Sequence, residues 1–472
     1  MDQRVERPIR RRQFLAKTLQ SGALAGTCLL IPTTVRGGDS ESSLRAGEGV
    51  VDITPPLGIE IGGFHREPGN ERRIRGIRQS TAARALVLQL KDSLVAIVSL
   101  DTAGVASDVA RRVQRQVADQ VGIPASNVRV CATHTHSMPG FFFARQWGAI
   151  PKDYMATVEK KAVEAVKLAK ADLAPARLML GKSRAVGGNF NRTSKTFKTD
   201  EQFSKGSTDA ERWLDTMVHV MLFERSGGRR NLLWYHFAAH PVCYADEQAG
   251  PDWPGLVDQK LRDSHQLTPS FLQGHAGDVN PGSGNSWRGD AEQTATAVHT
   301  AIRQAMDGLV RINVDTLRSR TEEFGVPLDM ELFKDWLARY RNDPSKCTSG
   351  EWVDAGFARA WFETNTQRKL DQTHLPVMLS ALRVGNVGLV FHPAEFYSYY
   401  GLAVRRDSPL SDTIVVGYTD GLIGYLADPQ AYQSGEYAAT TVPKILDFPP
   451  FTPQSAGELA SGAIRLLKKI GA

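Results

Sequence analysis

The sequence predicts an α/β fold in which mixed or antiparallel sheets are flanked by helices, within a single large domain over residues 45–472. Apolar runs of strand length occur in pairs that are separated by short polar turns, which is typical of β-hairpins. Between these pairs lie longer segments with apolar residues every three or four positions, which is typical of amphipathic helices. With 42% hydrophobic and 23% charged residues, the 472-residue chain has a globular composition and not a disordered or collagen-like one.

The first half of the chain contains two predicted hairpins. The first joins residues 85–90 and 94–100, and the second runs through residues 218–223, turns at 226–228 and returns along 232–239. Residues 107–121 are predicted to form a helix, because Val109, Val113, Val117 and Val121 recur at intervals of four. A strand at 128–132 and an alanine-rich helix from 153 to about 173 lie between the hairpins.

The second half contains one more predicted hairpin, in which residues 377–384 and 387–391 are joined across Gly385 and Asn386. A helix is predicted at about 290–309, and two more lie between residues 332 and 369. A strand at 413–417 and a helix that begins at residue 456 complete the chain. These elements alternate along the sequence, which is why one mixed α/β domain is expected.

The N-terminal 36 residues have the features of a twin-arginine export signal. Arg11 and Arg12 precede Phe14 and Leu15, and residues 21–31 form a short apolar segment rich in small residues. This segment is shorter than the roughly 20 residues that a membrane-spanning helix needs. We therefore expect a signal over residues 1–36, a periplasmic or secreted protein, and no span in the mature chain. An ordinary basic tail is the alternative.

The basic excess of the chain is confined to this N-terminal segment. Residues 1–36 hold seven Lys and Arg residues against two Asp and Glu residues, a net +5 of the formal +6. The remainder is near neutral and has no basic stripe, so no nucleic-acid partner is expected.

Three cysteines, Cys131, Cys243 and Cys347, follow the predicted signal. An odd number argues against a disulfide framework, and buried small apolar side chains are the favoured interpretation. Cys131 and Cys243 each lie three residues from a histidine that is a candidate metal ligand. The two could therefore be neighbours, and the sequence leaves open whether they pair.

Four predicted strands end near side chains that bind metal ions. They lead to His134 and His136, to His240, to Glu395, and to a loop that contains Tyr418 and Tyr425. Side chains at strand ends converge when the strands share a sheet, and His134 and His136 would point to the same face of an extended chain. Zinc prefers histidine and carboxylate ligands, with one position left for water or substrate. The set is therefore a candidate zinc (Zn2+) site.

Each of these residues also has an ordinary structural interpretation. A His-x-His pair is more often a hydrogen-bonded pair than a metal site. His240 precedes a proline, and Glu395 could be the partner of a structural cation. No local His-Glu-x-x-His signature is present, so the site depends on strands that meet only in the fold.

Short motifs in a fixed order along the chain point to a known family. The most specific is Ala132-Thr-His-Thr-His-Ser-Met-Pro-Gly140. Supporting motifs are Asp52-Ile-Thr-Pro-Pro56, Gly62-Gly-Phe64, Ser99-Leu-Asp101, Asn191-Arg192, Gly277-Asp-Val-Asn-Pro281 and Pro393-Ala-Glu-Phe396. With these motifs the sequence resembles the neutral ceramidase family, whose members are zinc-dependent amidohydrolases.

The resemblance implies a zinc ion held by His134, His240, Glu395 and Tyr425, and a reacting centre lined by His136, Arg192 and Tyr437. The sequence departs from the family pattern after His240, where it reads Pro-Val-Cys-Tyr-Ala-Asp instead of a stretch rich in Ser and Asn. It also departs at Asn280, which stands where the family has a serine with a catalytic role. An amide side chain cannot supply a hydroxyl nucleophile or relay a proton as serine does. Asn280 is therefore grouped with the candidate substrate-binding residues.

Water is the expected nucleophile, since zinc lowers the pKa of a bound water towards about 7 and polarises a carbonyl. His136 is the first candidate for the base, and Asp278 is the second. Arg192 and Tyr437 are candidate hydrogen-bond donors to the developing oxyanion. Asp252 could bind substrate or hold the loop that carries His240, and the loop role is favoured.

Three functions remain open on this sequence. The first is an exported zinc hydrolase that cleaves the amide bond of an N-acyl compound such as a lipid. The second is a zinc enzyme of the same fold that acts on a carbohydrate as an esterase, glycosidase or uronate lyase, which the missing serine favours. The third is a non-catalytic protein that binds lipid or glycan. Aromatic residues at 141–143, 147, 253 and 287 suit an acyl chain and a sugar ring equally, and the oligomeric state is left open.

Overall fold

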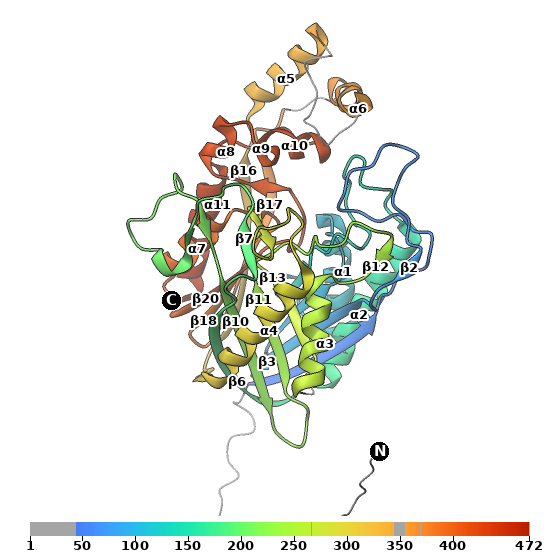
Figure 1. The fold of residues 1–472 in the computed structure, drawn as a ribbon. Coiled ribbons are helices and arrows are strands. Elements are labelled where there is room, and N and C mark those ends of the chain that lie inside the picture. Colours follow the sequence, from blue (N-terminus) through green and yellow to red (C-terminus); the bar gives the residue numbers. More distant parts are fainter. Residues whose placement is uncertain (1–43, 266, 344–354, 369–370, 472) are drawn as a thin grey trace, which may run out of the picture. The chain divides into compact units, whose positions relative to one another are not determined.

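Two β-sheets form the centre of the fold (Figure 1). The computed structural model describes residues 44–265, 267–343, 355–368 and 371–471. In these ranges the larger sheet has nine strands and the smaller has four. The larger sheet has the order β13 (Pro269–Gln273), β11 (Leu232–Phe237), β10 (Met217–Arg225), β6 (Ala174–Arg184), β1 (Arg45–Asp52), β3 (Ala82–Leu90), β4 (Ser93–Leu100) and β5 (Val128–Ala132), with β15 (Val310–Ile312) paired to β6. The smaller sheet has the order β16 (Leu317–Pro327), β17 (His374–Val384), β18 (Val387–Phe391) and β20 (Asp412–Val416).

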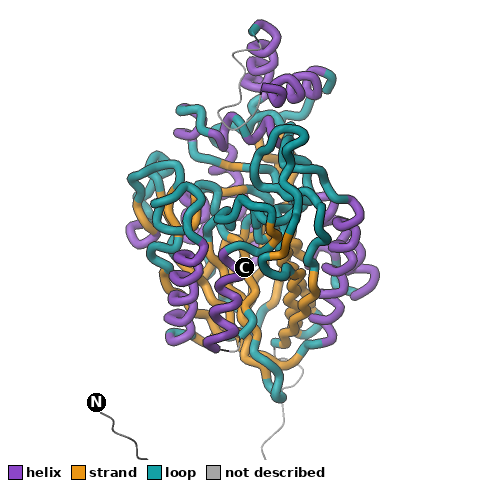
Figure 2. Tube along the Cα trace, turned by 45° about the vertical axis from the view of Figure 1, so that its right-hand side comes forward, coloured by secondary structure: helices purple, strands orange, loops and turns teal. Residues whose placement is uncertain are grey.

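Both sheets are mixed. The pairs β4–β5, β11–β13 and β18–β20 are parallel, and the other pairs of these two sheets are antiparallel. Short pairs outside the two sheets are β2 (Gly76–Ile77) with β12 (Gln248–Ala249), β7 (Asn189–Asn191) with β14 (Val279–Pro281), β8 (Lys198–Thr199) with β9 (Trp213–Leu214), and β19 (Glu395–Phe396) with β21 (Tyr425–Leu426). Helices flank the strands on both sides (Figure 2). The predicted fold class is therefore confirmed.

The helices cover the outer faces of the two sheets. α1 (Ser107–Val121) and α2 (Lys152–Ala171) pack over the β1–β5 half of the larger sheet, and α3 (Trp253–His265) and α4 (Ala291–Asp307) pack over the β6–β13 half. α7 (Ser398–Asp407) and α11 (Ser455–Gly471) cover the smaller sheet. The remaining helices are α5 (Met330–Asn342), α6 (Ala355–Thr366), α8 (Pro429–Gln433), α9 (Tyr437–Thr440) and α10 (Val442–Ile445). No helix in the described ranges combines the length and the hydropathy that crossing a membrane requires.

Strand β3 shows how the layers are held together. Ala85 and Val87 pack in the cluster that contains the apolar faces of α1 and α2. Leu86 and Leu88, on the opposite face, pack in a second cluster with residues of the smaller sheet such as Phe391. Because both of its faces are buried, the sequence of β3 is an almost continuous run of apolar residues and does not alternate between apolar and polar residues. The two sheets thus pack face to face with helices outside them.

Most elements predicted from apolar patterns are present close to their predicted positions. The β3–β4 hairpin, the strand β5 and both ends of α1 agree with the prediction. Strand β11 ends at Phe237, two residues before its predicted end, and α2 ends at Ala171 instead of about residue 173. These differences are of the size expected when helix and strand ends are read from patterns alone.

The strands β1, β6, β13 and β16 and the helices α3 and α7 were not predicted. Strand β1 contains two glycines and β6 contains a proline and charged residues, and such residues are disfavoured in strands. Their conformation follows from pairing, since β1 lies between β3 and β6 in the sheet. Tertiary contacts therefore override local propensity at these strands.

The described residues belong to one compact unit, residues 41–472, and the predicted signal at 1–36 lies outside the described residues. Cys131 and Cys243 are both free thiols. Cys131 is buried with its sulfur 3.3 Å from Oγ1 of Thr419, and burial raises the pKa of both thiols. Neither cysteine therefore stabilises the fold as a disulfide, and Cys347 lies outside the described residues.

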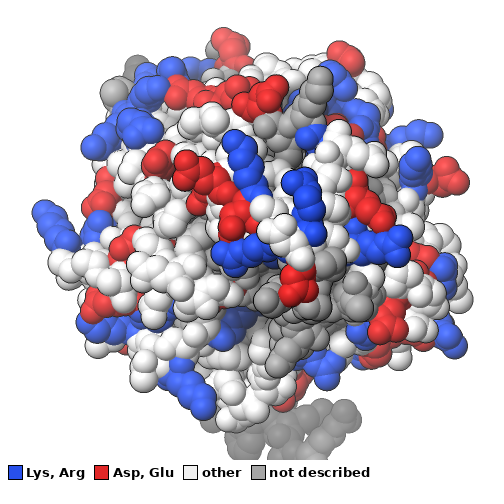
Figure 3. All heavy atoms as spheres, turned by 90° about the horizontal axis from the view of Figure 1, so that it is seen from above, with Lys and Arg blue, Asp and Glu red and all other residues white. Residues whose placement is uncertain are grey.

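Charged side chains of both signs are interspersed on the face shown in Figure 3. Three arginines of the basic run between residues 72 and 78 pair with acidic residues, and the fourth, Arg72, donates to backbone carbonyl oxygens. Arg75 is 2.7 Å from Glu247, and Arg73 and Arg78 contact Glu60 and Asp246. Acidic partners therefore offset the charge of three of the four arginines in this run.

Four buried histidines, His219, His236, His275 and His392, lie outside the group formed by His134, His136 and His240. Burial lowers the pKa of His236 to about 3 and that of His392 to about 3, and it lowers the pKa of His219 well below its usual value. His275 instead contacts a carboxylate, with Nε2 3.0 Å from Oδ2 of Asp215. The fold therefore holds several imidazoles that resist protonation.

These histidines predict that the protein loses stability in acid. Between about pH 6.5 and 3 the unfolded chain binds protons that the folded chain does not, so each such histidine lowers the free energy of unfolding by roughly 1.4 kcal/mol per pH unit as the pH falls. Urea unfolding between pH 7.5 and 5, with a chelator present, measures this slope. We expect His392→Asn to reduce it by about one proton equivalent, because an asparagine oxygen can still accept from the backbone N–H of Ala394 as Nδ1 does.

The matched control is His374→Asn, which replaces an exposed histidine and is expected to leave the slope unchanged. Equal slopes for the wild-type protein and His392→Asn would contradict the assignment of the acid sensitivity to the buried imidazoles.

Candidate metal centre

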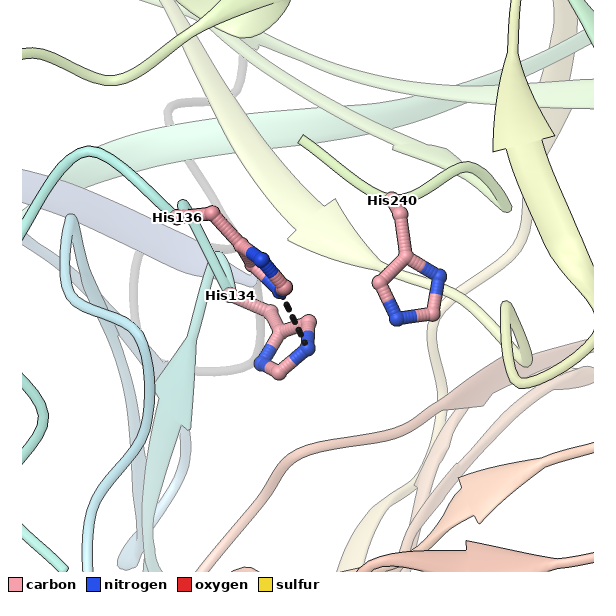
Figure 4. A group of neighbouring side chains, drawn as sticks. All are labelled: His134, His136 and His240. Atoms are coloured by element: carbon pink, nitrogen blue, oxygen red, sulfur yellow. Dashed lines mark hydrogen bonds between the residues drawn. The ribbon is translucent and has the colours of Figure 1, made fainter. Parts of the chain in front are cut away.

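His134 follows β5 in a backbone conformation that the sequence did not predict. β5 ends at Ala132, and the φ of His134 is +65°, in the left-handed region that residues other than glycine seldom occupy. The prediction that His134 and His136 lie on one face of an extended strand is therefore wrong. Their imidazoles still converge, with the two Nε2 atoms 3.2 Å apart (Figure 4). A strained turn brings the pair together, and such strain is concentrated at functional sites.

The side chain of Gln273 joins the two strand ends that lead to His134 and His240. Its amide nitrogen donates to the carbonyl oxygen of Thr133 at 3.2 Å and to that of Ala239 at 2.9 Å. These two carbonyls belong to the residues directly before the histidines. Gln273 is buried at the end of β13, so both of its N–H groups are used and the separation of the two strand ends is fixed.

The outer ring nitrogens of His134 and His240 are held by backbone carbonyls. Nδ1 of His134 is 2.6 Å from the oxygen of Ala103, and Nδ1 of His240 is 3.0 Å from the oxygen of Val279. A carbonyl oxygen only accepts, so we assign the imidazole proton to each Nδ1 and a lone pair to each Nε2. Carbonyl partners of this kind orient metal-binding histidines in proteins.

A carboxylate oxygen meets these two acceptor nitrogens. Oε2 of Glu395 is 3.1 Å from Nε2 of His240 and 3.4 Å from Nε2 of His134. Burial opposes ionisation of Glu395, but a proton on a neighbouring imidazole outweighs it and holds the pKa of this carboxyl well below its usual range. Three buried lone-pair atoms that face one another are unfavourable unless a proton or a cation lies between them. Ligand atoms around a tetrahedral zinc ion are about 3.3–3.4 Å apart, so these residues fit such an ion.

His136 is the third imidazole at this point. His134, His136 and His240 form a buried group whose ligand atoms all lie within 4.8 Å of one another, and this group could hold a metal ion (Figure 4). Burial, together with the two neighbouring imidazoles, lowers the pKa of His136 well below its usual value, so the ring is neutral near pH 7. Its Nδ1 is buried and makes no hydrogen bond with the described residues. A neutral imidazole of this kind can take up a proton or bind a cation.

Two residues that the sequence analysis did not identify hold His136 in place. The buried guanidinium of Arg72 donates to the carbonyl oxygen of His136 at 2.6 Å, and it also contacts the carbonyl oxygens of Gly62 and Asp246. Gly63 lies against the imidazole, because a Cβ at this position would be 2.6 Å from Cβ and Cγ of His136. The paired glycines of the Gly62-Gly63 motif were the available signal, since glycine is required where a backbone approaches a ring this closely.

Tyr425 lies beside Glu395 because their short strands pair in register. Glu395 in β19 is directly opposite Tyr425 in the parallel strand β21. The guanidinium of Arg192 donates to the phenol oxygen of Tyr425 at 2.7 Å and to the carbonyl oxygen of Gly277 at 2.7 Å. Burial raises the pKa of Tyr425 well above its usual value, and Arg192 acts in the opposite direction. Arg192 therefore orients the phenol and partly offsets the cost of its ionisation.

Tyr418, the other tyrosine in the loop after the 413–417 strand, contacts His134. Tyr418 stacks on His134, with ring centroids 4.3 Å apart and an interplanar angle of 27°. Its backbone carbonyl accepts from the N–H of Ala132, so the loop after β20 runs beside the end of β5. The smaller sheet thus contributes a wall of the site through Tyr418.

Asp278, the second candidate base, has both carboxylate oxygens engaged in the interior. Oδ1 accepts from the backbone N–H and the hydroxyl of Ser398, both at 2.8 Å, and Oδ2 accepts from the side-chain amide of Asn191 at 2.7 Å. Burial raises its pKa. These contacts favour a structural role, in which Asp278 holds the strand that leads to Arg192.

The two candidate substrate-binding residues also make structural contacts. Asp252 accepts from the backbone N–H of Trp253 at 2.7 Å and from that of Tyr244 at 3.3 Å, and burial raises its pKa to about 6. Tyr244 belongs to the loop after His240, so the geometry favours the loop role for Asp252. Asn280 is buried, its amide donates to the carbonyl oxygen of Trp287, and its oxygen is 3.3 Å from the guanidinium of Arg192.

A small apolar cavity adjoins Glu395 and Tyr425. Tyr437 lies in its wall, as the resemblance implied, and the other lining residues are Phe142, Ala144, Trp147, Leu422, Val442, Ile445 and Leu446. Its free volume is about 10 Å³, which is the space for about one water molecule. A substrate that enters this cavity must therefore displace side chains or place only a small group there.

A model of a protein family matches more than half of this chain. It describes the N-terminal part of neutral/alkaline non-lysosomal ceramidases, and it matches residues 44–301. The chain belongs to this family. The matched range includes His134, His136, Arg192 and His240 and ends before Glu395. The resemblance to the ceramidase family is therefore confirmed.

Several neutral ceramidases are similar to this chain in sequence. A neutral ceramidase from Mycobacterium tuberculosis is 23% identical over 478 residues, which covers 84% of this chain and 73% of that protein. One from Drosophila pseudoobscura is 25% identical over 281 residues, which covers 55% of this chain and 38% of that protein. The chain therefore spans well under half the length of the insect ceramidase that it matches.

Solved ceramidase structures share the fold. The crystal structure of neutral ceramidase from Pseudomonas aeruginosa has a TM-score of 0.68 with 19% identity, and the match covers 91% of this chain and 75% of that one. A ceramidase complexed with C2 matches equally well, with a TM-score of 0.68 over 90% of this chain. These matches extend the common fold over the C-terminal residues that supply Glu395 and Tyr425.

The geometry predicts that metal binding depends on the residues that meet at this point. We expect the wild-type protein to bind zinc. Loss of a residue that only hydrogen-bonds to a metal ligand typically weakens metal binding by roughly 10- to 100-fold, and we expect His134→Ala, His240→Ala and Glu395→Ala to weaken it further. Dialysis against buffered zinc followed by elemental analysis measures the affinity. His392→Asn, at a buried histidine outside the site, is the control, and loss of zinc from this variant alone would contradict the assignment.

The close approach of Gly63 to His136 gives a second prediction. Gly63→Ala is expected to destabilise the protein by about 2–4 kcal/mol, because it adds overlap with the imidazole to the cost of a side chain at positive φ. Displacement of the imidazole is also expected to lower hydrolytic activity by about 100-fold. The control is Gly69→Ala, since Gly69 has nearly the same φ and no atom within 4 Å of the added Cβ. Urea unfolding and rate measurements compare the two, and equal effects would show that the contact with His136 is unimportant.

Proposed function

We propose that this protein is a zinc-dependent hydrolase that cleaves the amide bond of an N-acyl compound with water as the nucleophile. The observation that carries the proposal is the convergence of Nε2 of His134, Nε2 of His240 and Oε2 of Glu395, three lone-pair atoms whose separations suit one tetrahedral ion. The register of Tyr425 with Glu395 supports Tyr425 as a further ligand. Membership of a family named for ceramidases supports the reaction class.

A zinc ion in this site would supply Lewis acidity and lower the pKa of water, and the residues around it supply the remaining chemistry. His136, whose Nε2 is 3.2 Å from Nε2 of His134, is the candidate to take a proton from the attacking water and to return one to the leaving amine. Arg192 offers guanidinium donors beside the phenol of Tyr425, where charge on a substrate oxygen could be stabilised. Asn280 cannot act as a nucleophile, so the proposal does not use a covalent intermediate on the protein.

The proposed substrate class is an N-acyl lipid of the ceramide type. The cavity beside Glu395 is apolar, as an acyl group requires, and the related proteins from M. tuberculosis and P. aeruginosa are named neutral ceramidases. The C2 complex was observed in the matched ceramidase and not in this chain. It supports the substrate class here by analogy of fold alone.

A carbohydrate substrate is the second candidate function. The observation that favours it is at Asn280, which replaces the family serine and whose amide donates to the backbone of Trp287. Trp287 is 51% exposed, and an exposed aromatic ring beside a polar site is a common platform for sugar rings. Under this proposal the same metal centre would act on an ester, a glycoside or a uronate.

One assay separates these candidates. Zinc-loaded protein is incubated with N-acyl sphingoid amides of different acyl length and with a panel of esterified and uronate-containing glycans, with and without chelator. Amide cleavage that is lost with chelator and in His134→Ala is the expected result. Chelator-sensitive turnover of glycans alone would replace the proposal with the second candidate, and zinc binding without any turnover would indicate a non-catalytic binding protein.

We also propose that the chain is exported by the twin-arginine route, because Arg11 and Arg12 precede a short apolar segment. Expression in a bacterium that has this route, followed by fractionation, is expected to place the protein in the periplasm. Replacement of both Arg11 and Arg12 by lysine should keep it in the cytoplasm, because the receptor reads the guanidinium pair and not the charge alone. Arg7→Lys with Arg10→Lys is the control of equal charge, and retention of this control as well would contradict the assignment.

A further inference from the structure

His65 is an imidazole near the cavity that the proposed chemistry does not use. It follows Gly62-Gly63-Phe64 and is partly buried. Its Nε2 is 3.3 Å from the phenol oxygen of Tyr437 and 3.3 Å from Nε1 of Trp147. Tyr437 and Trp147 both line the cavity beside Glu395. His65 therefore contacts the substrate cavity through two of its wall residues.

The contact with Trp147 decides which atom donates. An indole N–H only donates, so Nε2 of His65 must present its lone pair, and we assign the proton of this neutral ring to Nδ1. The bond between Nε2 and Tyr437 then has one possible direction, in which the phenol O–H donates to the imidazole. Burial raises the pKa of Tyr437, so the phenol keeps this proton near neutral pH.

A phenol that donates its only proton to His65 has only lone pairs left for the cavity. The other polar side chains that line this cavity are Glu395 and Tyr425, and the guanidinium of Arg192 donates to the phenol oxygen of Tyr425. The proposed function uses Glu395 and Tyr425 as ligands of the metal ion. With those two groups committed to the metal ion, the Tyr437 oxygen is the acceptor in the described cavity wall that remains for the substrate. A secondary amide matches this pattern, because its carbonyl accepts and its N–H donates.

We infer that His65 fixes the Tyr437 hydroxyl as a hydrogen-bond acceptor towards the substrate, and that this pair selects substrates with an N–H or O–H donor beside the scissile carbonyl. His65 is thus a positioning residue for specificity, and Tyr437 accepts from the substrate where the resemblance implied a donor to the oxyanion. The inference rests on the proposed function, because it uses the same cavity.

The test compares an N-acyl sphingoid amide with its N-methyl counterpart, which lacks the N–H and keeps the carbonyl. Binding to the zinc-loaded protein is measured by calorimetry, and kcat/KM is measured for both. We expect the wild-type protein to prefer the N–H amide by about tenfold, the effect of about one hydrogen bond in a site with little water.

Variants then show whether the preference comes from the pair. His65→Phe keeps a ring against Trp147 and removes the acceptor, so the preference for the N–H amide is expected to fall to about twofold or less. His65→Gln offers a side-chain oxygen as acceptor and is expected to restore most of it. Tyr437→Phe should abolish the preference, and adding His65→Phe to Tyr437→Phe should cause no further change. A His65→Phe effect that is equal for both amides, or that persists without the Tyr437 hydroxyl, would show a merely structural role and overturn the inference.

Failure of this inference differs from failure of the proposed function. If neither amide is turned over, the proposed amide hydrolysis is wrong, and the calorimetric preference still decides the role of His65. If both amides are turned over with the same kcat/KM and bind equally in the wild-type protein, hydrolysis stands and the inference is overturned.

Discussion

The electrostatic constraint on which this structure depends is the meeting of three buried lone-pair atoms at one point. The Nδ1 atoms of His134 and His240 are committed to backbone carbonyls, so their Nε2 atoms can only accept. The carboxylate of Glu395 joins them at hydrogen-bond distance. Such a group is costly inside a protein unless it shares a proton or binds a cation. The favourable packing of the two sheets must therefore offset the cost of holding these atoms together.

Contacts from several segments of the fold hold the three imidazoles in position. Gln273 links the two strand ends, Tyr418 stacks on His134, and Arg72 holds the backbone of His136. The left-handed backbone of His134 is the clearest sign of the strain that these contacts support. An unstrained strand end would point the two imidazoles elsewhere. The same contacts therefore support the strained loop and the group that could hold a metal ion.

The sequence was informative about which residues take part and less so about how they meet. His134, His136, His240, Glu395 and Tyr425 could be named because polar residues that follow apolar runs are conspicuous. Their convergence was predicted from strand ends that share a sheet. For His134 and His136 it was attributed to strand alternation, whereas a turn produces it. Arg72, Gln273 and His65 could not be identified, because each acts through a partner that is far away in the sequence. Asp278 was a candidate base in the sequence, and only the fold shows that its carboxylate accepts hydrogen bonds from Asn191 and Ser398.

By itself, the sequence determined the fold class, most helices and hairpins, and the family, since apolar periodicity and short motifs are local properties of the chain. It also determined the chemical types gathered at the site. The tertiary structure alone decided strand order, the direction of side chains after the strand ends, and which polar groups are already satisfied. Those features depend on contacts between segments that are hundreds of residues apart, and hydrogen-bond partners at such distances leave no periodic signal in a single sequence.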